Sequence, residues 1–252
     1  MISTRSVRRL VAATLLGLTA ATVAAPSEAG TYRLAGLWLF NEGSGQAARD
    51  WSSNGNTGQL GSSPVADAND PAWVALPRLF LLKRAALRFD GDDFVKVADA
   101  PSLEPDGVTV VARVRATGSP GAFRYVASKG ALSCQTASYG LYTGIDGGLR
   151  FYISDGDSYE LSPDAGTGLW DGAWHTVVGA YDGTRVRLSV DGESLGETPS
   201  TLAIRYGMPS DDNFYVGDYG GPCSNPLGFV GDVDGVAVIG SYAPADAGVV
   251  SP

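Results

Sequence analysis

Eight Asp-Gly pairs punctuate this chain of 252 residues, and they constrain its fold more than any other feature. Asp-Gly accepts the positive φ angles of tight hairpin turns, so each pair is expected where a strand reverses direction. Frequent reversals favour short antiparallel strands over helices. The pairs lie at residues 90–91, 106–107, 146–147, 155–156, 171–172, 182–183, 191–192 and 234–235.

Short runs of alternating apolar and polar residues lie between these pairs. In segment 185–190, Val186, Leu188 and Val190 share one face and polar residues the other, which is the pattern of a half-buried strand. No long stretch has apolar residues at helical spacing, so we predict an all-β fold in which two antiparallel sheets pack face to face as a sandwich. The other predicted strands are 34–40, 86–90, 94–98, 108–115, 124–128, 138–143, 149–154, 175–181, 213–217 and 229–239.

The apolar segment 76–87 is the exception to this alternation. Its apolar residues 79–82 stand directly before Lys83 and Arg84. Pro77 could open a short helix here, and an irregular apolar plug over the edge of the sandwich is an equally good interpretation.

Residues 1–29 differ from the rest of the chain in composition. Arg5, Arg8 and Arg9 precede an apolar and small-residue run over 10–25, which is the pattern of a secretory signal peptide. The run is shorter than the roughly 20 residues that a membrane-spanning helix needs, and segment 27–29 fits peptidase cleavage before Gly30. We therefore expect a signal peptide over 1–29, a single domain over 30–252, and a secreted monomer without a membrane span.

The charge and the cysteines narrow the partners and the compartment. The net charge is −9, and an acidic surface repels nucleic acid, because a phosphate backbone demands clustered Lys and Arg. Cys134 and Cys223 are the two cysteines, and an even pair in an exported protein is expected to form a disulfide. The alternative is two unpaired buried thiols.

Six segments stand in a specific order between Leu34 and Ile239. They are 36–43 (GLWLFNEG), 50–56 (DWSSNGN), 87–91 (LRFDG), 170–177 (WDGAWHTV), 181–192 (YDGTRVRLSVDG) and 229–236 (FVGDVDGV). In this order and spacing the chain resembles secreted bacterial LamG-like jelly-roll domains of the laminin G and concanavalin A-like lectin/glucanase superfamily. The resemblance implies two antiparallel jelly-roll sheets, one of them concave, with chain ends that pair close together. Segment 72–84 departs from the family pattern because it is bulkier and more apolar.

Calcium is the one cofactor that the composition suits, because Asp, Asn, Ser and backbone carbonyls supply its hard oxygen ligands. Asp50 and Asn54 stand in a segment that begins like a calcium loop, although the closing Glu is missing. Asp90, Asp92 and Asp93, joined by Asp232 or Asp234 near the paired chain ends, form the second candidate set. The resemblance supports calcium because many LamG-like domains hold this ion. The alternative is that these residues act only as turn formers.

Sugar recognition needs aromatic faces that stack on the apolar patches of a sugar, flanked by hydrogen-bonding groups. Tyrosines are available at 139, 142, 152, 159, 206 and 219. The residues that we predict to bind the ligand are Tyr139, Tyr142, Tyr152, Trp170 and Tyr219. For each tyrosine the alternative is an ordinary strand residue with a buried ring and a hydrated hydroxyl.

The sequence offers little for catalysis. Asp155, Asp157 and Glu160 reproduce the carboxylate spacing of glucanases with this architecture, with Asp in place of the leading Glu. Gly156 between them marks a turn tip, where charges are solvated and are not shifted toward catalytic pKa values. His175 is the sole histidine, so a His-His zinc cluster is excluded, and we expect it to serve packing or a hydrogen bond.

These observations predict a secreted, non-catalytic module that binds an extracellular glycan or mediates adhesion. The first alternative is an extracellular protein-interaction domain, as LamG-like modules often are. The second is a glycoside hydrolase or polysaccharide lyase of concanavalin A-like fold, which would require Asp157 and Glu160 to face each other in a cleft.

Overall fold

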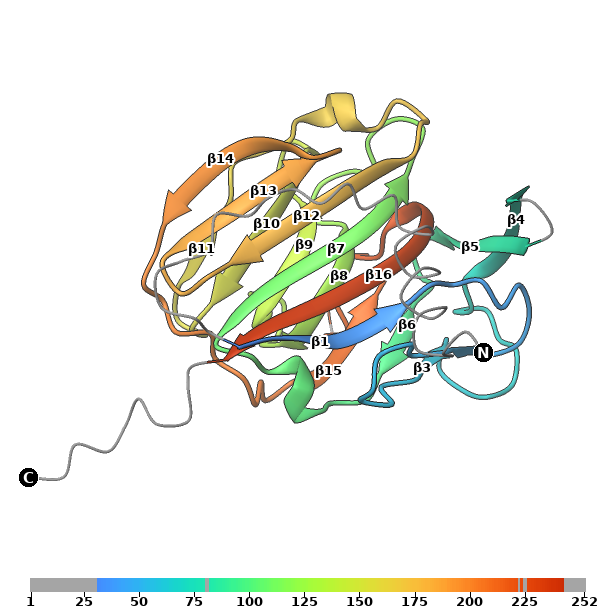
Figure 1. The fold of residues 1–252 in the computed structure, drawn as a ribbon, viewed down its shortest axis with the longest axis horizontal. Helices are drawn as coiled ribbons and strands as arrows, with labels where there is room; N and C mark the ends of the chain where they lie inside the picture. Colours follow the sequence, from blue (N-terminus) through green and yellow to red (C-terminus); the bar gives the residue numbers. More distant parts are fainter. Residues whose placement is uncertain (1–30, 80–81, 222, 224–225, 243–252) are drawn as a thin grey trace, which may run out of the picture.

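The computed structural model describes residues 31–79, 82–221, 223 and 226–242, so the predicted signal peptide lies outside the described residues. About half of this part of the chain forms the strands of two antiparallel sheets (Figure 1). Sheet I runs in the order β14 (Glu193–Pro199), β13 (Arg185–Val190), β12 (His175–Tyr181), β7 (Gly107–Arg115), β16 (Val230–Tyr242), β5 (Leu82–Asp90) and β4 (Ala72–Leu79), and β1 (Thr31–Trp38) also pairs with β16.

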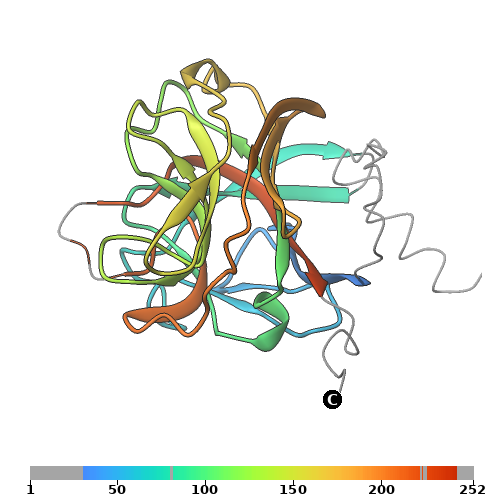
Figure 2. The same ribbon diagram turned by 90° about the vertical axis from the view of Figure 1, so that its left-hand side faces the viewer.

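Sheet II contains eight strands and faces sheet I. It runs in the order β11 (Tyr159–Leu161), β10 (Leu149–Ser154), β9 (Tyr139–Thr143), β8 (Tyr125–Ala131), β15 (Asp211–Val216), β6 (Val95–Val97), β3 (Gly58–Leu60) and β2 (Ala47–Ala48). Figure 2 shows the two layers from the side, with the green-to-yellow strands of sheet II apart from the orange strands of sheet I. The predicted all-β sandwich is confirmed.

The core lies between the sheets and follows from the alternation in the sequence. Val108, Val110 and Val114 of β7 are at most 1% exposed and face sheet II. Trp38 of sheet I stacks on Phe214 of sheet II, with ring centroids 5.3 Å apart. Burying one large apolar side chain stabilises the fold by roughly 1.5–3 kcal/mol. Each strand is therefore oriented with its apolar face toward the opposite sheet.

The Asp-Gly pairs serve two different connections. Four of them, at 146–147, 155–156, 182–183 and 191–192, join neighbouring antiparallel strands of one sheet, as predicted. In the last of these, Asp191 and Gly192 have φ angles of 51° and 85°, the positive values that a two-residue hairpin turn requires. The pairs at 90–91, 106–107 and 171–172 lie instead where the chain crosses between the sheets.

The pair at 234–235 is not a reversal, and that prediction is wrong. It lies inside β16, where the pairing with β7 shifts register between Val233 and Val236. Gly235 has a φ of 126°, and a Cβ there would lie 3.1 Å from the carbonyl oxygen of Trp38. A bulge inside a strand needs the same positive φ as a turn, so sequence composition alone does not separate the two.

The described residues of segment 76–87 belong to β4, the edge strand of sheet I, and to its neighbour β5, so they form neither the short helix nor the irregular plug that the sequence left open. Leu87 and Phe89 of β5 are buried in the core. Pro77 is tolerated because β4 is an edge strand, and the ladder shifts register between Leu76 and Leu79.

A disulfide joins Cys134 and Cys223, whose Cα atoms lie 5.3 Å apart, as predicted. Cys134 follows β8, and Cys223 follows the neighbouring strand β15. Because β8 and β15 are antiparallel, the segments that follow them leave opposite ends of sheet II. The bond therefore ties the segment after β15 back to the loop after β8.

The described helices are two single 3-10 turns, η1 (Pro101–Leu103) and η2 (Thr167–Leu169). In the described part of the chain, no helix has the length and apolar character needed to cross a membrane.

Candidate functional site

A pocket of about 330 Å³ lies on the outer face of sheet II. Leu141 and Phe151 point into the core, so their strand neighbours Tyr142 and Tyr152 point to the opposite face. We call this hollow the tyrosine pocket. Its lining consists of Phe123, Tyr125, Cys134, Gln135, Thr136, Tyr142, Tyr152, Tyr159, Tyr219, Cys223 and Leu227.

The tyrosine rings of the pocket support one another. Tyr125 stacks on Tyr142 at 5.3 Å between centroids, and Tyr142 meets the edge of Tyr152 at 5.0 Å. Tyr219 lies 5.0 Å from Tyr125. Each such pair contributes about 0.5–1.5 kcal/mol beyond area burial, so the cluster holds its shape before a ligand arrives.

Hydrogen bonds orient the rings of the floor. The hydroxyl of Tyr152 accepts from the backbone N–H of Ala137 at 2.8 Å, and the hydroxyl of Tyr219 donates to the carbonyl of Thr136 at 2.6 Å. Burial raises the pKa of Tyr142 and of Tyr219 to about 12. These hydroxyls are therefore neutral at physiological pH and can both donate and accept hydrogen bonds.

The rim of the pocket offers exposed aromatic faces. Phe123 is 42% exposed and Tyr159 is 58% exposed, whereas the floor tyrosines are nearly buried. The Cys134–Cys223 disulfide forms part of the wall. Among the described residues that line the pocket, none carries a carboxylate, an ammonium, a guanidinium or an imidazole.

Three of the five predicted ligand-binding residues, Tyr142, Tyr152 and Tyr219, meet in this pocket. Tyr139 and Trp170 do not. Tyr139 is fully buried between the sheets and donates to the carbonyl of Leu103, because its odd separation from Tyr142 puts it on the other face of β9. Trp170 is 3% exposed and donates to the carbonyl of Gly147.

The predicted ligand-binding set omits Phe123, Tyr125 and Tyr159, although Tyr159 is among the tyrosines that the sequence offers. Tyr125 precedes the core residue Val126 in a predicted strand, so alternation could have placed it on the outer face. Phe123 lies in the loop before β8, and no periodicity signals its position.

The predicted calcium ligands separate into three places. Asp50 accepts hydrogen bonds from the backbone N–H groups of Leu37, Ser52 and Asn56, and thereby ties its loop to β1. Asn54 donates from its side chain to the carbonyl of Leu34 at 2.8 Å. Both carboxylate oxygens of Asp50 therefore already accept hydrogen bonds from the protein backbone.

Asp232 lies among arginines on the outer face of sheet I. Arg88 and Arg115 both bond its carboxylate. Burial raises the pKa of Asp232, but these two guanidiniums outweigh it and hold the pKa below its usual value. The carboxylate therefore already has cationic partners, and it does not join Asp90 and Asp93.

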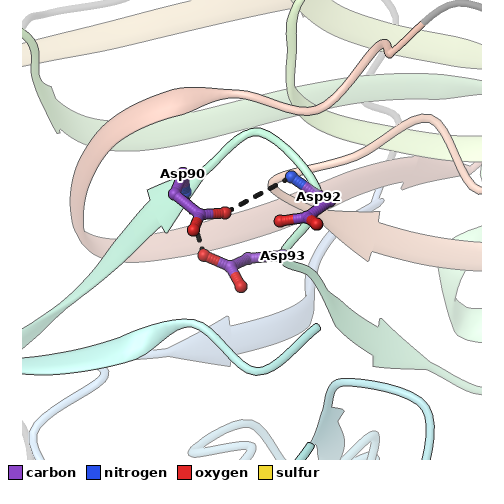
Figure 3. A group of neighbouring side chains, drawn as sticks. All are labelled: Asp90, Asp92 and Asp93. Carbon is purple, nitrogen blue, oxygen red and sulfur yellow. Dashed lines mark hydrogen bonds between the residues drawn. The ribbon is translucent and has the colours of Figure 1, made fainter. Parts of the chain in front are cut away.

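Asp90 and Asp93 do come together, with Asp92, at the end of β5 (Figure 3). One carboxylate oxygen from each residue lies within 4.8 Å of the others. Asp93 is 5% exposed, and burial, aided by the charge of Asp90, raises its pKa to about 7. No ion pair to any of the three occurs within the described ranges.

These residues fit a calcium ion. Because Ca²⁺–O bonds measure about 2.3–2.6 Å, two ligands of one ion lie up to about 5 Å apart, as these oxygens do. The side chain of Asn69 donates to the carbonyl of Asp92 at 3.0 Å, which brings the loop 67–70 against the cluster. In that region Gln46 Oε1 and Asp70 Oδ1 are buried without a described hydrogen-bond partner, so hard acceptor oxygens are in excess.

The carboxylates of Asp155, Asp157 and Glu160 are not among the groups that line the tyrosine pocket, although Tyr159 of the same segment is. Asp155 accepts from the backbone N–H groups of Asp157 and Ser158, which lowers its pKa. Glu160 pairs with Ile153, a core residue, so it lies on the opposite face of β11 from Tyr159. His175 is held between Asp171 and Asp191 in sheet I.

Comparisons with known proteins agree with this architecture. Residues 89–245 match the family described as the Concanavalin A-like lectin/glucanases superfamily. No curated protein matches the sequence. Domain 4 of AbnA, a GH43 extracellular arabinanase from Geobacillus stearothermophilus solved in complex with arabinotriose, superposes with a TM-score of 0.57 at 15% identity, covering 85% of this chain and 96% of that domain.

A sialidase of Trypanosoma rangeli, in complex with the inhibitor DANA, superposes with a TM-score of 0.55 at 17% identity. The match covers 95% of this chain and 35% of the sialidase, so this chain spans about a third of that enzyme. At such identities the likeness concerns the fold. Together with the family match over more than half of the residues, it establishes that the chain belongs to the concanavalin A-like lectin/glucanases superfamily.

Proposed function

We propose that this protein binds a carbohydrate in the tyrosine pocket, outside the cell and as a monomer, without cleaving it. The observation that carries the proposal is a pocket of about 330 Å³ lined by six aromatic rings and several neutral polar groups. This volume lies in the range of small-molecule pockets, about 300–1,000 Å³. Aromatic faces match the apolar C–H patches of sugars, and neutral hydroxyls match sugar hydroxyls.

Two further observations support this proposal. The fold is shared with a domain that was solved in complex with arabinotriose. Glycoside hydrolysis usually needs a pair of carboxylates across the sugar, and the described lining of the pocket contains none. The shared fold and the lack of lining carboxylates in the described residues both support binding of a carbohydrate without its hydrolysis.

The test is to titrate the full chain with plant, microbial and host oligosaccharides, using calorimetry for affinity and product analysis for turnover. Tyr159→Ala should weaken binding about tenfold, which corresponds to 1.4 kcal/mol. Tyr32→Ala is the matched control, because Tyr32 is 54% exposed but lies on β1 of sheet I. Absence of binding across the panel would refute the proposal, and capture of a protein partner that sugars do not displace would favour the protein-interaction alternative.

We also propose that Asp90, Asp92 and Asp93 hold a calcium ion. Three carboxylates without a cationic partner repel one another, and a divalent ion would remove that repulsion. An ion that binds only the folded state raises the free energy of unfolding by mass action.

Calcium should therefore raise the melting temperature of the full chain, and Asp93→Asn should abolish the increase. Asp157→Asn is the control, because Asp157 is an exposed residue of a distant turn. An equal response to Mg²⁺, or an undiminished response in the Asp93 variant, would argue against a calcium site here.

A further inference from the structure

We infer that the tyrosine pocket accepts uncharged sugars and discriminates against acidic ones, such as sialic and uronic acids. This inference rests on the proposed carbohydrate binding and names the class of ligand. It starts from the lining, in which the polar groups are the Gln135 amide, the Thr136 hydroxyl and tyrosine hydroxyls. None of these provides the positive charge that a buried carboxylate requires.

The protonation of the tyrosines strengthens this conclusion. Burial raises the pKa of Tyr125, Tyr142, Tyr152 and Tyr219. A pocket that destabilises phenolate by desolvation destabilises a ligand carboxylate for the same physical reason. The electrostatic cost applies to any anion that enters without a partner.

The arginines beside the pocket are engaged elsewhere. Arg150 on β10 donates to the carboxylate of Asp164 at 2.8 Å, so this pair adds no net charge. Arg124 donates to the carbonyls of Pro226 and Gly228 at 2.8 and 3.3 Å, so its guanidinium keeps its charge but is directed at the loop backbone. Neither arginine lines the pocket, and the sequence positions 222, 224 and 225 beside Cys223 are Pro, Ser and Asn, which carry no charge.

The neutral hydroxyls remain available for a sugar. Within the described residues, the hydroxyls of Tyr142 and Tyr159 make no hydrogen bond, whereas those of Tyr125, Tyr152 and Tyr219 are bonded in the floor. Tyr142 lies against the floor rings, and Tyr159 stands at the exposed rim 6.4 Å from the ring of Tyr152. Two free hydroxyls flanking aromatic faces suit a ligand that carries hydroxyls and no charge.

The experiment compares matched oligosaccharides, one series neutral and one capped with a sialic or uronic acid, by calorimetry on the full chain at two salt concentrations. Neutral members should bind with affinities that do not change with salt, and acidic members should bind at least about tenfold more weakly. Tyr159→Ala should weaken the neutral series, which assigns the binding to this pocket.

Adding a positive charge to the pocket tests whether the lack of such a charge causes the discrimination against acidic sugars. Gln135→Arg should raise the affinity for acidic members relative to neutral ones by about tenfold, since Gln135 is an exposed lining residue. Ser194→Arg adds the same charge on β14 of sheet I, and it should leave that ratio unchanged.

The outcomes separate this inference from the proposed function. Acidic sugars that bind as tightly as neutral ones, and lose affinity with Tyr159→Ala, would overturn the inference while the pocket remains a glycan site. An unchanged ratio in the Gln135 variant would also count against it. Failure of both series to bind would overturn the proposed function itself.

Discussion

The hydroxyl oxygens of Tyr125 and Tyr152 lie 3.2 Å apart, within hydrogen-bonding distance, on the floor of the tyrosine pocket. Their strands, β8 and β10, are separated by β9, so the two rings meet across Gly140. A Cβ at position 140 would lie 2.7 Å from the Cε1 atom of Tyr152 and 3.1 Å from that of Tyr125. The two rings can therefore meet only because residue 140 is a glycine and has no side chain.

Gly140→Ala should displace these rings, destabilise the protein by about 1–3 kcal/mol and weaken glycan binding. Urea unfolding measures the first effect and calorimetric titration the second. Gly168→Ala is the control, because a Cβ there meets no atom within 4 Å. Equal unfolding midpoints for the two variants would show that the floor adapts without cost.

Lys129 is fully buried, and its ammonium lies 2.8 Å from Asp99 and 3.0 Å from Asp212. Lys129→Met leaves these carboxylates without their cation, so we expect a loss of about 3 kcal/mol in the free energy of unfolding. Lys96→Met, on β6, removes a lysine whose one side-chain interaction within the described residues is a ring contact to Tyr215, and it should cost less than about 1 kcal/mol. A loss below 1 kcal/mol for the Lys129 variant would contradict this account.

His175 bonds Asp191 through Nδ1 at 2.7 Å and Asp171 through Nε2 at 3.1 Å. Burial lowers its pKa, but the two carboxylates outweigh burial and raise the pKa above 6.5. A raised pKa in the folded state means that this contribution is present below pH 6.5 and lost as pH rises through the folded value. Asp191→Asn should lower the pKa.

The sole histidine gives a single imidazole signal in a proton NMR titration, so the measurement needs no assignment. A midpoint at or below 6.5 in the unsubstituted protein would contradict the prediction. Glu160→Gln is the control, because Glu160 lies on β11 of the other sheet and should leave the midpoint in place.

Burial raises the pKa of Asp93 from 3.8 to about 7, with a smaller contribution from neighbouring carboxylates. The carboxyl therefore binds its proton more tightly when folded, and stability should fall as pH rises from about 4 to above 7 in the presence of a chelator. Bound calcium favours the ionised carboxylate of Asp93, so it should offset this fall in stability with pH. Thermal unfolding at pH 5 and pH 8 measures both effects.

In the variant Asp93→Asn the side chain at position 93 cannot ionise. The stability of this variant should therefore lack the part of the pH dependence that Asp93 contributes. Because His175 contributes with the same sign in an overlapping range, both proteins should carry His175→Gln in this comparison. The same fall in stability with and without the Asp93 carboxyl would assign the effect to another group.

Much of the fold could be predicted because alternation and turn chemistry are local. His175–Tyr181 and Arg185–Val190 begin and end where the alternation indicates. With the exception of β4, which has eight mostly apolar residues, the strands that were not predicted are short or polar. β14 is an example, since most of its residues are exposed and its partner β13 holds it through backbone hydrogen bonds.

By itself, the sequence determined which residues can form strands, which two cysteines are able to pair, and which tyrosines alternate with apolar residues. The tertiary structure alone decided that Tyr125, Tyr142, Tyr152 and Tyr219 converge in one pocket. The side-chain direction within a strand is a local property of the backbone. The order of strands in a sheet depends on burial between segments far apart in the chain, so it is set only when both layers are packed.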